Sequence, residues 1–449
     1  MTVTEHLAEA IATATPTPAM AVMVQTLLID ITGICVAARD SDFLTAARKG
    51  VDAGGPCTVI GLPGRFQPAD AALLNGTAAH GEDFDDTFEG GPVHAGAVIV
   101  PAVLAAAERH GLSGQAAMHA IAIGAELTCR LSIVVPKAVH KAGFHPTSVF
   151  GAIGAAAAVG TLLKLPTGQL VSALGIAGSM ASGIIEYLAE GTWTKRLHPG
   201  WAAQSGYRAA RMAEGGFTGP RTLMEGSHGL FNGFTHKIPT DWSALLDGFG
   251  TRWVSETIAF KPYACGTMIH PYIDCARRLA ARGIDLDQIE AIECETSEGI
   301  LHRLWEPLEA KRNPPNGYAA KFSIPYGVAA GLILGQAGLS AFSDAQAADP
   351  KLQRMARRVS YRVDPANPYP DQFTGHVCLM MRDGTHLEER QPHFRGGATE
   401  PLTRTEIAEK FQLNCRYGGW DESRAARLLG LCEALFQSSA PVSLSAFEG

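Results

Sequence analysis

The chain has 449 residues, of which 46% are hydrophobic and 18% are charged, and its formal net charge is −7. This length exceeds what one hydrophobic core usually serves, so two domains are expected, and the apolar content excludes a disordered chain. An acidic balance without a basic patch argues against nucleic acid and against an anionic membrane surface as partners.

Targeting and redox signals both favour the cytoplasm. The N-terminal segment MTVTEHLAEA has neither the basic nor the apolar region of a signal peptide. The longest nearly apolar run, residues 149–163, is too short to span a bilayer. The nine cysteines are odd in number and form no C-x-x-C pair, so we expect reduced thiols, and neither a zinc ribbon nor a cysteine-held cluster.

The first 260 residues read mainly as apolar helices, beginning with a short helix capped by Thr4. Residues 57–60 predict a short strand, and Asp70 is expected to cap a helix that runs into residue 75. The other predicted helices span residues 20–39, 41–50, 95–109, 114–134, 149–163, 170–189 and 202–214. Alanine and glycine recur at helical spacing and allow close approach, which predicts an all-α bundle.

One polar stretch interrupts these helices: NGTAAHGEDFDDTFEGGPVHAGAVIVP, residues 75–101. It contains the acids Glu82, Asp83, Asp85, Asp86 and Glu89, the hydroxyl of Thr87, and the histidines His80 and His94. A solvated acidic loop with a helix cap explains the central acids, but it does not explain a histidine at each end before a long apolar helix. Because burying unpaired charge is unfavourable, this density of ionisable groups favours a functional site.

A second candidate segment is AGFHPTSVFGAIG, in which His145 precedes Pro146. The residue before proline is extended, and Thr147 or Ser148 is then expected to cap the next helix. His145 would lie at the positive end of a buried helix, where an anion can bind. A solvent-facing loop histidine is the alternative.

A third segment, EGTWTKRLHPGWAAQSG, brings Lys195, Arg196 and His198 together just before the helix predicted at 202–214. Its Gly- and Pro-framed turn favours a contact from Lys195 to an anion or a carboxylate. The glycine-rich residues 216–234 contain neither G-x-G-x-x-G nor P-loop spacing, so we predict no nucleotide cofactor.

The composition changes after about residue 251. The loop at Lys261 leads to a helix that carries His270, and a hairpin is predicted around Asp383 and Gly384. Between them lie predicted strands at 289–296 and 359–364 and predicted helices at 325–334 and 350–358. Residues 403–411 and 422–436 return to helix. We therefore predict a helical domain of residues 1–261 and 397–449, and an α+β domain of residues 262–396.

Four motifs, in this order along the chain, resemble the MmgE/PrpD family: HGEDFDDTFEGGPVHAG, GFHPTSVFG, TKRLHPGWAAQSG and FKPYACGTMIHPYIDC. That family includes 2-methylcitrate dehydratase, cis-aconitate decarboxylase and iminodisuccinate epimerase. The resemblance covers nearly the whole chain. It implies a mainly α fold with a large all-helical domain and a smaller α+β lid domain, a homodimer, and catalysis without a metal or an organic cofactor.

The resemblance also implies a decarboxylase-type active site. Its residues would be His94, Asp83, His145, Lys195, Thr87 and Tyr326. His198 would bind substrate, and so would His270 and Lys261, which are expected at the domain cleft. The spacing from Thr87 to His94 is one residue longer than in the animal decarboxylases of the family.

The residue types suit proton transfer at a carbon α to a carboxylate. Lys195, His145 and a helix N-terminus can neutralise the carboxylates of a small di- or tricarboxylate. A histidine, here His94, can move the proton, a contribution of typically ~10²–10⁴-fold, and Asp83 can orient that histidine or act as the base itself. Asp83 and Thr87 are four residues apart and would share one face of a helix. We therefore expect a cofactor-independent lyase, either a dehydratase or a decarboxylase, with epimerisation by the same proton abstraction as the alternative.

Two other readings stay open at this point. A metal-dependent hydro-lyase could use His80, Asp83, Asp85 and His94 as ligands, since imidazole and carboxylate are good metal donors. A non-catalytic carboxylate-binding protein would explain the cationic residues but not the acids beside them.

Overall fold

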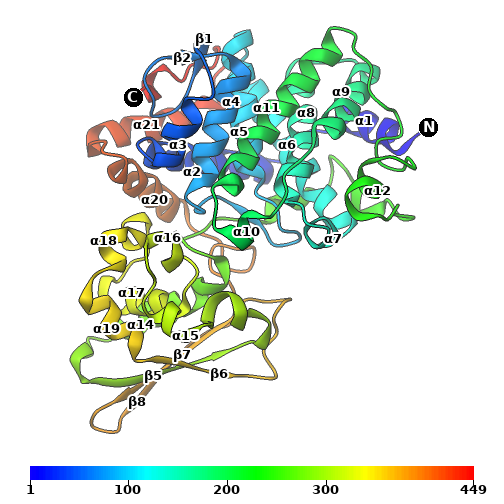
Figure 1. The fold of residues 1–449 in the computed structure, drawn as a ribbon. Helices are drawn as coiled ribbons and strands as arrows, with labels where there is room; N and C mark the ends of the chain where they lie inside the picture. The colour runs from blue at the N-terminus through cyan, green and yellow to red at the C-terminus, as the bar shows by residue number, and fades with distance from the viewer. The chain divides into compact units, whose positions relative to one another are not determined.

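The structure is a computed structural model that describes all 449 residues (Figure 1). The chain divides into two compact units, residues 1–259 with 404–449 and residues 260–403. The fold is mainly helical, as expected, with strands concentrated in the second unit. The helical unit ends two residues before the predicted boundary at 261, and it resumes at 404, seven residues after the predicted 397.

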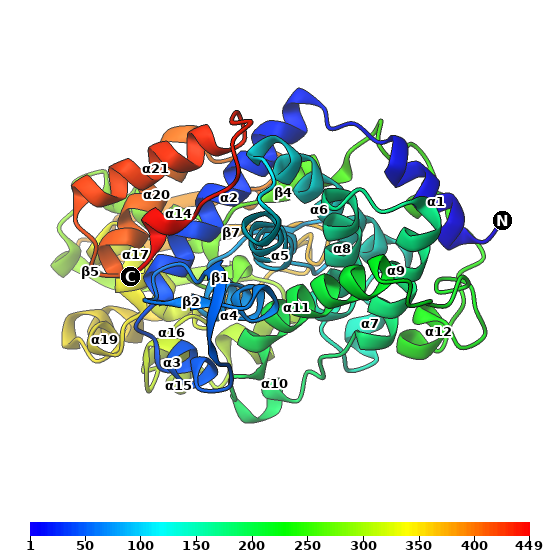
Figure 2. The same ribbon diagram turned by 90° about the horizontal axis from the view of Figure 1, so that it is seen from above.

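Helix α5 (Ala95–His110) lies at the centre of the larger unit. Figure 2 looks almost along its axis and shows other helices around it. Those that pack against it are α2 (Pro18–Ala38), α4 (Pro68–Gly81), α6 (Gly114–Val134), α8 (Pro146–Leu162) and α11 (Thr194–Glu214). Every residue of α5 from Ala95 to Ala107 is buried, because the helix is apolar all round.

Small residues set the close helix packing, as predicted. A Cβ added at Gly124 of α6 would lie 2.8 Å from the Ala158 Cβ of α8, and one added at Gly154 would lie 2.8 Å from the Gly124 carbonyl oxygen. At this crossing neither glycine has room for a side chain. Helices α6 and α8 therefore approach with their backbones nearly in contact at this crossing.

The remaining elements of the larger unit surround this core. They are α1 (Val3–Thr13), α3 (Asp42–Arg48), α7 (Ala138–Lys141), α9 (Thr167–Met180), α10 (Tyr187–Glu190), α12 (Leu230–Thr235), α13 (Ser243–Leu246) and the paired strands β1 (Ala53–Thr58) and β2 (Arg65–Phe66). The C-terminal helices α20 (Arg404–Tyr417) and α21 (Glu422–Leu435) pack against α2 (Figure 1). The C-terminus therefore rejoins the helical unit, as expected.

Two helices, α2 and α6, are long and apolar enough to cross a membrane by length and composition alone. Their most apolar windows are 67% and 78% buried inside the protein, so both act as core helices. All nine cysteines are free thiols, in agreement with the expected reduced state.

Several predicted helix ends were wrong. The first helix is capped by Thr2, not Thr4, and α4 begins after Gln67, which leaves Asp70 in its first turn. The helix expected to start at residue 202 begins at Thr194 and continues through Pro199 and Gly200, a pair that normally ends a helix. Gly200 in this pair lies directly against the Leu73 carbonyl of α4, where any side chain would overlap. Packing against α4 therefore maintains the helix here.

The smaller unit contains a four-stranded sheet in the order β6-β5-β7-β8. Its strands are β5 (Ile289–Thr296), β6 (Val359–Val363), β7 (Gly375–Met381) and β8 (His386–Gln391). The β7–β8 pair is the predicted hairpin, whereas β5 and β6 pair in parallel. Helix α14 (His270–Ala280) packs against β7, β8 and α17 (Ile324–Leu334).

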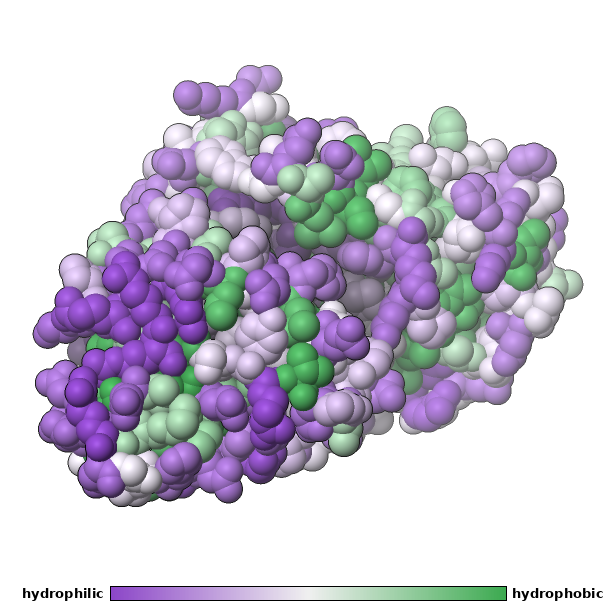
Figure 3. All heavy atoms as spheres, turned by 60° about the horizontal axis from the view of Figure 1, so that its bottom comes forward, coloured by the Kyte–Doolittle hydropathy of each residue, from purple (hydrophilic) through white to green (hydrophobic).

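The side of the sheet away from α14 is charged. Glu295 of β5 pairs with Arg362 of β6 and, at 2.6 Å, with Arg390 of β8. Figure 3 brings the sheet end of Figure 1 toward the viewer and shows hydrophilic side chains gathered there. Alternation of apolar and charged residues along β5 places one face of the strand in the core and the other toward solvent.

Candidate active site

The polar stretch leaves helix α4 through a sharp turn and does not continue as a helix. Asp83 adopts a left-handed backbone conformation (φ 54°), and its N–H donates to the His80 carbonyl oxygen at 3.0 Å. Thr87 then enters the two-residue strand β3 (Thr87–Phe88), which pairs with β4 (Ile258–Ala259). The expected common helix face for Asp83 and Thr87 is therefore wrong.

A tight turn at Gly90, Gly91 and Pro92 then folds the chain back. The Phe88 N–H donates to the Val93 carbonyl oxygen at 3.0 Å, which brings His94 beside the start of the loop. Gly91 in this turn lies against Ser132 of α6, where a Cβ would overlap the serine hydroxyl. A glycine is needed at this position because the loop and α6 are in contact.

The central acids of this loop are buried, although Glu89 is exposed, so the solvated-loop explanation of the central acids is wrong. Asp85 and Asp86 are fully buried, and Asp83 is 7% exposed. Asp86 Oδ2 accepts a hydrogen bond of 3.1 Å from the Gly96 N–H in the first turn of α5. This carboxylate therefore caps the N-terminus of the central helix, where negative charge is favoured.

Asp85 holds a histidine pair. His80, in the last turn of α4, places its Nδ1 2.7 Å from Asp85 Oδ2, and His94 Nδ1 lies 3.6 Å from the same oxygen. His94 Nδ1 also lies 2.6 Å from the Asp86 carbonyl oxygen. Since a carbonyl can only accept, Nδ1 carries the proton and Nε2 is the basic nitrogen of a neutral His94. The His80 side chain is fully buried, whereas that of His94 is 13% exposed, so His94 is the one that a substrate can reach.

His145 is itself the N-cap residue of α8, which begins at Pro146. The expected caps Thr147 and Ser148 lie one and two residues inside the helix. The Thr147 hydroxyl oxygen accepts instead from the His94 N–H at 3.2 Å and so ties the second candidate segment to the first. The His145 N–H donates to the Gly183 carbonyl oxygen at 2.8 Å.

A second histidine pair lies beside the first. His145 Nδ1 is 3.1 Å from His198 Nδ1, and the His145 ring centroid is 5.7 Å from that of His80. Burial, and then the neighbouring His80 and Lys195, lower the pKa of His198 to about 4. Burial, followed by the charges of the surrounding histidines and Lys195, lowers the pKa of His145 well below its usual range. His145 is therefore neutral near pH 7 and offers a hydrogen bond, not the positive charge that we expected from the sequence.

Lys195 supplies a cation at the site. It is the second residue of α11, and its Nζ lies 3.1 Å from Asp83 Oδ1. The Tyr187 ring lies 6.3 Å from the His145 ring and 5.8 Å from the His198 ring, centroid to centroid. The structure thus brings together six of the predicted site residues: Asp83, Thr87, His94, His145, Lys195 and His198.

Three helices begin at this cluster. His94 is the N-cap residue of α5, His145 is that of α8, and Lys195 lies in the first turn of α11. The N-terminal end of a helix carries a partial positive charge, which favours an anion. Together with Lys195, these helix ends suit a ligand with several carboxylates.

The other predicted residues belong to the smaller unit. Lys261 and His270 are both buried, and His270 Nε2 lies 3.1 Å from the Cys265 carbonyl oxygen. Tyr326 is fully buried, and its hydroxyl donates to the Ala341 carbonyl oxygen at 2.7 Å. This bond gives Tyr326 a structural role in the unit's core, and its catalytic role stays a prediction.

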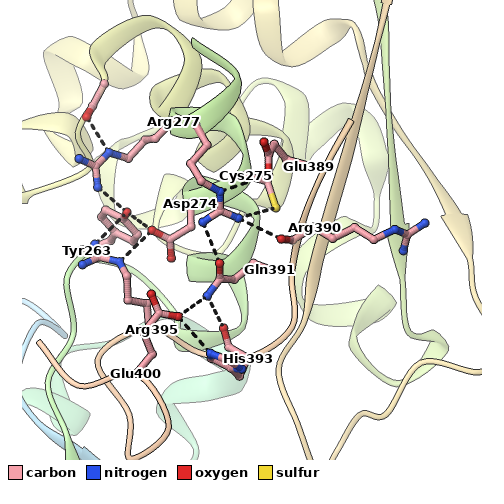
Figure 4. Close-up of polar contacts among 12 residues, drawn as sticks. Tyr263, Asp274, Cys275, Arg277, Glu389, Arg390, Gln391, His393, Arg395 and Glu400 are labelled. Atoms are coloured by element: carbon pink, nitrogen blue, oxygen red, sulfur yellow. Dashed lines mark hydrogen bonds and ion pairs between the residues drawn. The ribbon is translucent and has the colours of Figure 1, made fainter. Parts of the chain in front are cut away.

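A polar network holds the loop that carries Lys261 (Figure 4). The Tyr263 hydroxyl donates to Asp274 Oδ1 at 2.5 Å, and Arg395 Nε donates to the same oxygen at 3.0 Å. Arg277 donates to the Tyr263 hydroxyl oxygen at 2.7 Å. Burial and the Asp274 charge raise the pKa of Tyr263 to about 12, so its hydroxyl keeps its proton and the network stays paired at neutral pH.

Comparison with known proteins identifies the family. Residues 5–243 match the MmgE/PrpD N-terminal domain, and residues 263–433 match the MmgE/PrpD C-terminal domain. The chain belongs to the MmgE/PrpD family. The family's C-terminal domain includes α20 and α21, which in this structure pack within the helical unit.

Three relatives of the chain are cis-aconitate decarboxylases. That of Aspergillus terreus is 28% identical over 390 residues, covering 80% of this chain and 76% of the relative. That of Mus musculus is 29% identical over 365 residues, covering 80% and 74%. That of Homo sapiens is 29% identical over 379 residues, covering 81% and 76%.

Sequence reasoning missed four residues that contribute to the site. The sequence analysis gave His80 and Asp85 a specific role only as ligands in the metal-dependent alternative. Their spacing of five residues, a histidine followed by an acid, could have indicated that the two side chains pair. Nothing in the sequence singled out Tyr187. Lys410 was missed as well: its Nζ donates to the Phe84 carbonyl oxygen at 2.8 Å, between Asp83 and Asp85, from a helix 326 residues away.

Proposed function

We propose that this protein is a cofactor-independent lyase that acts on a small di- or tricarboxylate by proton transfer at the carbon α to a carboxylate. The observation that carries the proposal is the position of His94. Its Nδ1 is held by the Asp86 carbonyl oxygen, and it lies where three helices begin beside Lys195. Family membership and the related cis-aconitate decarboxylases support the same class of reaction.

Lys195 and the helix ends would bind the substrate carboxylates. Lys195 offers a charge-assisted contact, and the N-termini of α8 and α11 favour further negative charge. Neutral His145 would donate or accept a hydrogen bond, because burial keeps it unprotonated. Asp83 is paired with Lys195 at 3.1 Å and would orient that ammonium group, so we assign it a positioning role.

His94 would move the proton. In a dehydration, His94 Nε2 takes the proton from the α carbon, hydroxide leaves from the neighbouring carbon, and the proton on His94 passes to that oxygen to give water. In a decarboxylation, the bond to one carboxylate breaks, carbon dioxide leaves, and the electron pair left on carbon takes a proton from His94. The Asp86 carbonyl and the nearby Asp85 carboxylate stabilise the protonated ring that either reaction requires.

Dehydration or decarboxylation is the first choice, because the relatives are decarboxylases. Epimerisation of a polycarboxylate such as iminodisuccinate is the second candidate, because it begins with the same proton abstraction. Under this proposal five further residues contribute to substrate binding or catalysis: Thr87, His198, Lys261, His270 and Tyr326. The protein is also proposed to be a cytoplasmic homodimer. Analytical ultracentrifugation checks the last point.

The deciding experiment offers three substrates in heavy water. Incubation with 2-methylcitrate, cis-aconitate and iminodisuccinate, followed by NMR, reports the product and the carbon that takes up deuterium. We expect turnover of one of them with deuterium at the carbon α to a carboxylate. Tight binding of a polycarboxylate without turnover or exchange would instead support a carboxylate-binding protein.

A further inference from the structure

Three histidines of the cluster bring one ring nitrogen each to a common point. The ligand nitrogens of His80, His94 and His145 all lie within 4.8 Å of one another. The ring centroids of His80 and His94 are 4.7 Å apart, and those of His94 and His145 are 6.3 Å apart. The three come from the end of α4 and the beginnings of α5 and α8, so the meeting is set by the tertiary structure.

The other nitrogen of each ring already has an orienting partner. His80 Nδ1 lies 2.7 Å from Asp85 Oδ2, His94 Nδ1 lies 2.6 Å from the Asp86 carbonyl oxygen, and His145 Nδ1 lies 3.1 Å from a nitrogen of His198. Histidines that bind metals are held in this way, with the second N–H donated to a carboxylate, a carbonyl or another acceptor. The pattern turns the lone-pair nitrogens of His80 and His94 toward a ligand.

One of these nitrogens is buried without a hydrogen-bond partner: His80 Nε2. A buried nitrogen without a hydrogen-bond partner is unfavourable, so it normally has a role or a ligand. The mechanism proposed above does not use His80. Its orphaned nitrogen is therefore an observation separate from the geometry of the cluster.

We propose that His80, His94 and His145 form a binding site for a divalent transition-metal ion such as Zn²⁺ or Co²⁺, and that the bound ion blocks catalysis by occupying His94. Imidazole nitrogens select these ions over Mg²⁺ and Ca²⁺. Three protein nitrogens leave one position of a tetrahedral ion for water or a carboxylate. The inhibition of catalysis by the bound ion rests on the proposed function of His94 as the proton-transfer residue. The existence of the metal site does not rest on it.

The geometry explains why the ion acts as a reversible inhibitor and not as a resident cofactor. Zinc–nitrogen bonds of about 2.0–2.1 Å in a tetrahedron place the ligand nitrogens roughly 3.4 Å apart. Nitrogens up to 4.8 Å apart must therefore move inward when the ion binds. The Asp85 carboxylate, 2.7 Å from His80 Nδ1, offsets part of the ion's charge.

The first experiment measures binding without reference to activity. Chelator-treated, desalted wild-type protein is titrated with Co²⁺ while the visible absorption bands of cobalt and the heat of binding are followed. We expect one equivalent to bind, and we expect His80→Gln and His145→Gln each to weaken binding at least tenfold. The exposed histidine variant His228→Gln is the matched control and should bind as the wild type does. Circular dichroism confirms that each variant is folded.

The second experiment adds Zn²⁺ to the turnover assay with free zinc set by a metal buffer, since polycarboxylates themselves bind zinc. Activity should fall at least tenfold with the midpoint found for binding, and a chelator should restore it. Absence of Co²⁺ binding, or binding that survives both buried-histidine substitutions, overturns the metal site whether or not a substrate is turned over. Activation by the ion overturns the inhibitory role. Failure of the metal-free protein to turn over any polycarboxylate bears on the proposed function alone, because the binding measurement stands apart from it.

Discussion

A lysine from the C-terminal helix α20 holds the loop that carries the site acids. Lys410 Nζ lies 2.7 Å from Asp30 Oδ1 of α2, 2.8 Å from the Phe84 carbonyl oxygen and 3.9 Å from the centre of the Phe84 ring. The Lys410 side chain is 6% exposed and that of Asp30 is fully buried. Replacing Lys410 by methionine keeps most of the volume and removes the charge, so both Asp30 and the loop carbonyl lose this ammonium contact.

The expected loss of stability follows from burial. Removing one partner of a buried ion pair leaves a buried charge and costs about 3–5 kcal/mol. Lys410→Met should therefore lower the free energy of unfolding by about that amount. Replacing both residues, as in Asp30→Val with Lys410→Met, removes the stranded charge and should recover most of the loss, since apolar replacement of a whole buried pair is often neutral.

Catalysis should respond differently from stability. The Phe84 carbonyl stays unheld in the double variant, so the flanking Asp83 and Asp85 can shift, and displacements on the order of 1 Å can cost ~10- to 100-fold in rate. We expect kcat to fall by about this factor in both Lys410→Met and the double variant, with a smaller change in KM. Asp30→Asn, which keeps the lysine, is the control and should retain most of kcat.

The assay pairs urea unfolding with steady-state kinetics on the substrate identified above. Recovery of kcat along with stability in the double variant would show that Lys410 acts only on the fold. A change of less than about 1 kcal/mol in Lys410→Met would refute the argument from the buried charge itself.

Three further outcomes are expected. His94→Gln should lower kcat at least ~10²-fold and leave KM nearly unchanged, because only a transition-state role is lost. Lys195→Ala should lower kcat and also raise KM. A near-normal kcat with a raised KM in His94→Gln would make His94 a binding residue. Activity should survive exhaustive chelation, and a loss restored only by added Fe²⁺ or Zn²⁺ would support the metal-dependent hydro-lyase. Burial lowers the pKa of His198 from 6.5 to about 4, so as the pH falls the unfolded chain takes up this proton before the folded protein does. The free energy of unfolding should therefore be full above pH 6.5. It should decrease by up to roughly 3 kcal/mol between pH 6.5 and about 4. Thermal unfolding against pH should show a shallower slope over this window for His198→Asn than for the wild type, and equal slopes would contradict the assignment.

The sequence by itself determined the elements whose signal is local. The helix Gly114–Val134 and the strand Ile289–Thr296 lie at their predicted positions, and the hairpin forms around Asp383 and Gly384. Hydrophobic periodicity and turn-forming residues act over a few neighbouring positions, so they can be read without a structure. The order of the four family motifs belongs to the same local information and was enough to identify the family.

Only the tertiary structure decided how the site is assembled. Asp85 and Asp86 look like solvated acids in the sequence, yet both are buried, Asp85 against His80 of α4 and Asp86 against Gly96 of α5. Helix α11 starts at Thr194 because α4 packs against Gly200, and the positive charge expected at His145 is lost because the residue is buried. Burial, helix packing and contacts such as that of Lys410 with Phe84 join residues far apart in the chain, and no local pattern specifies them.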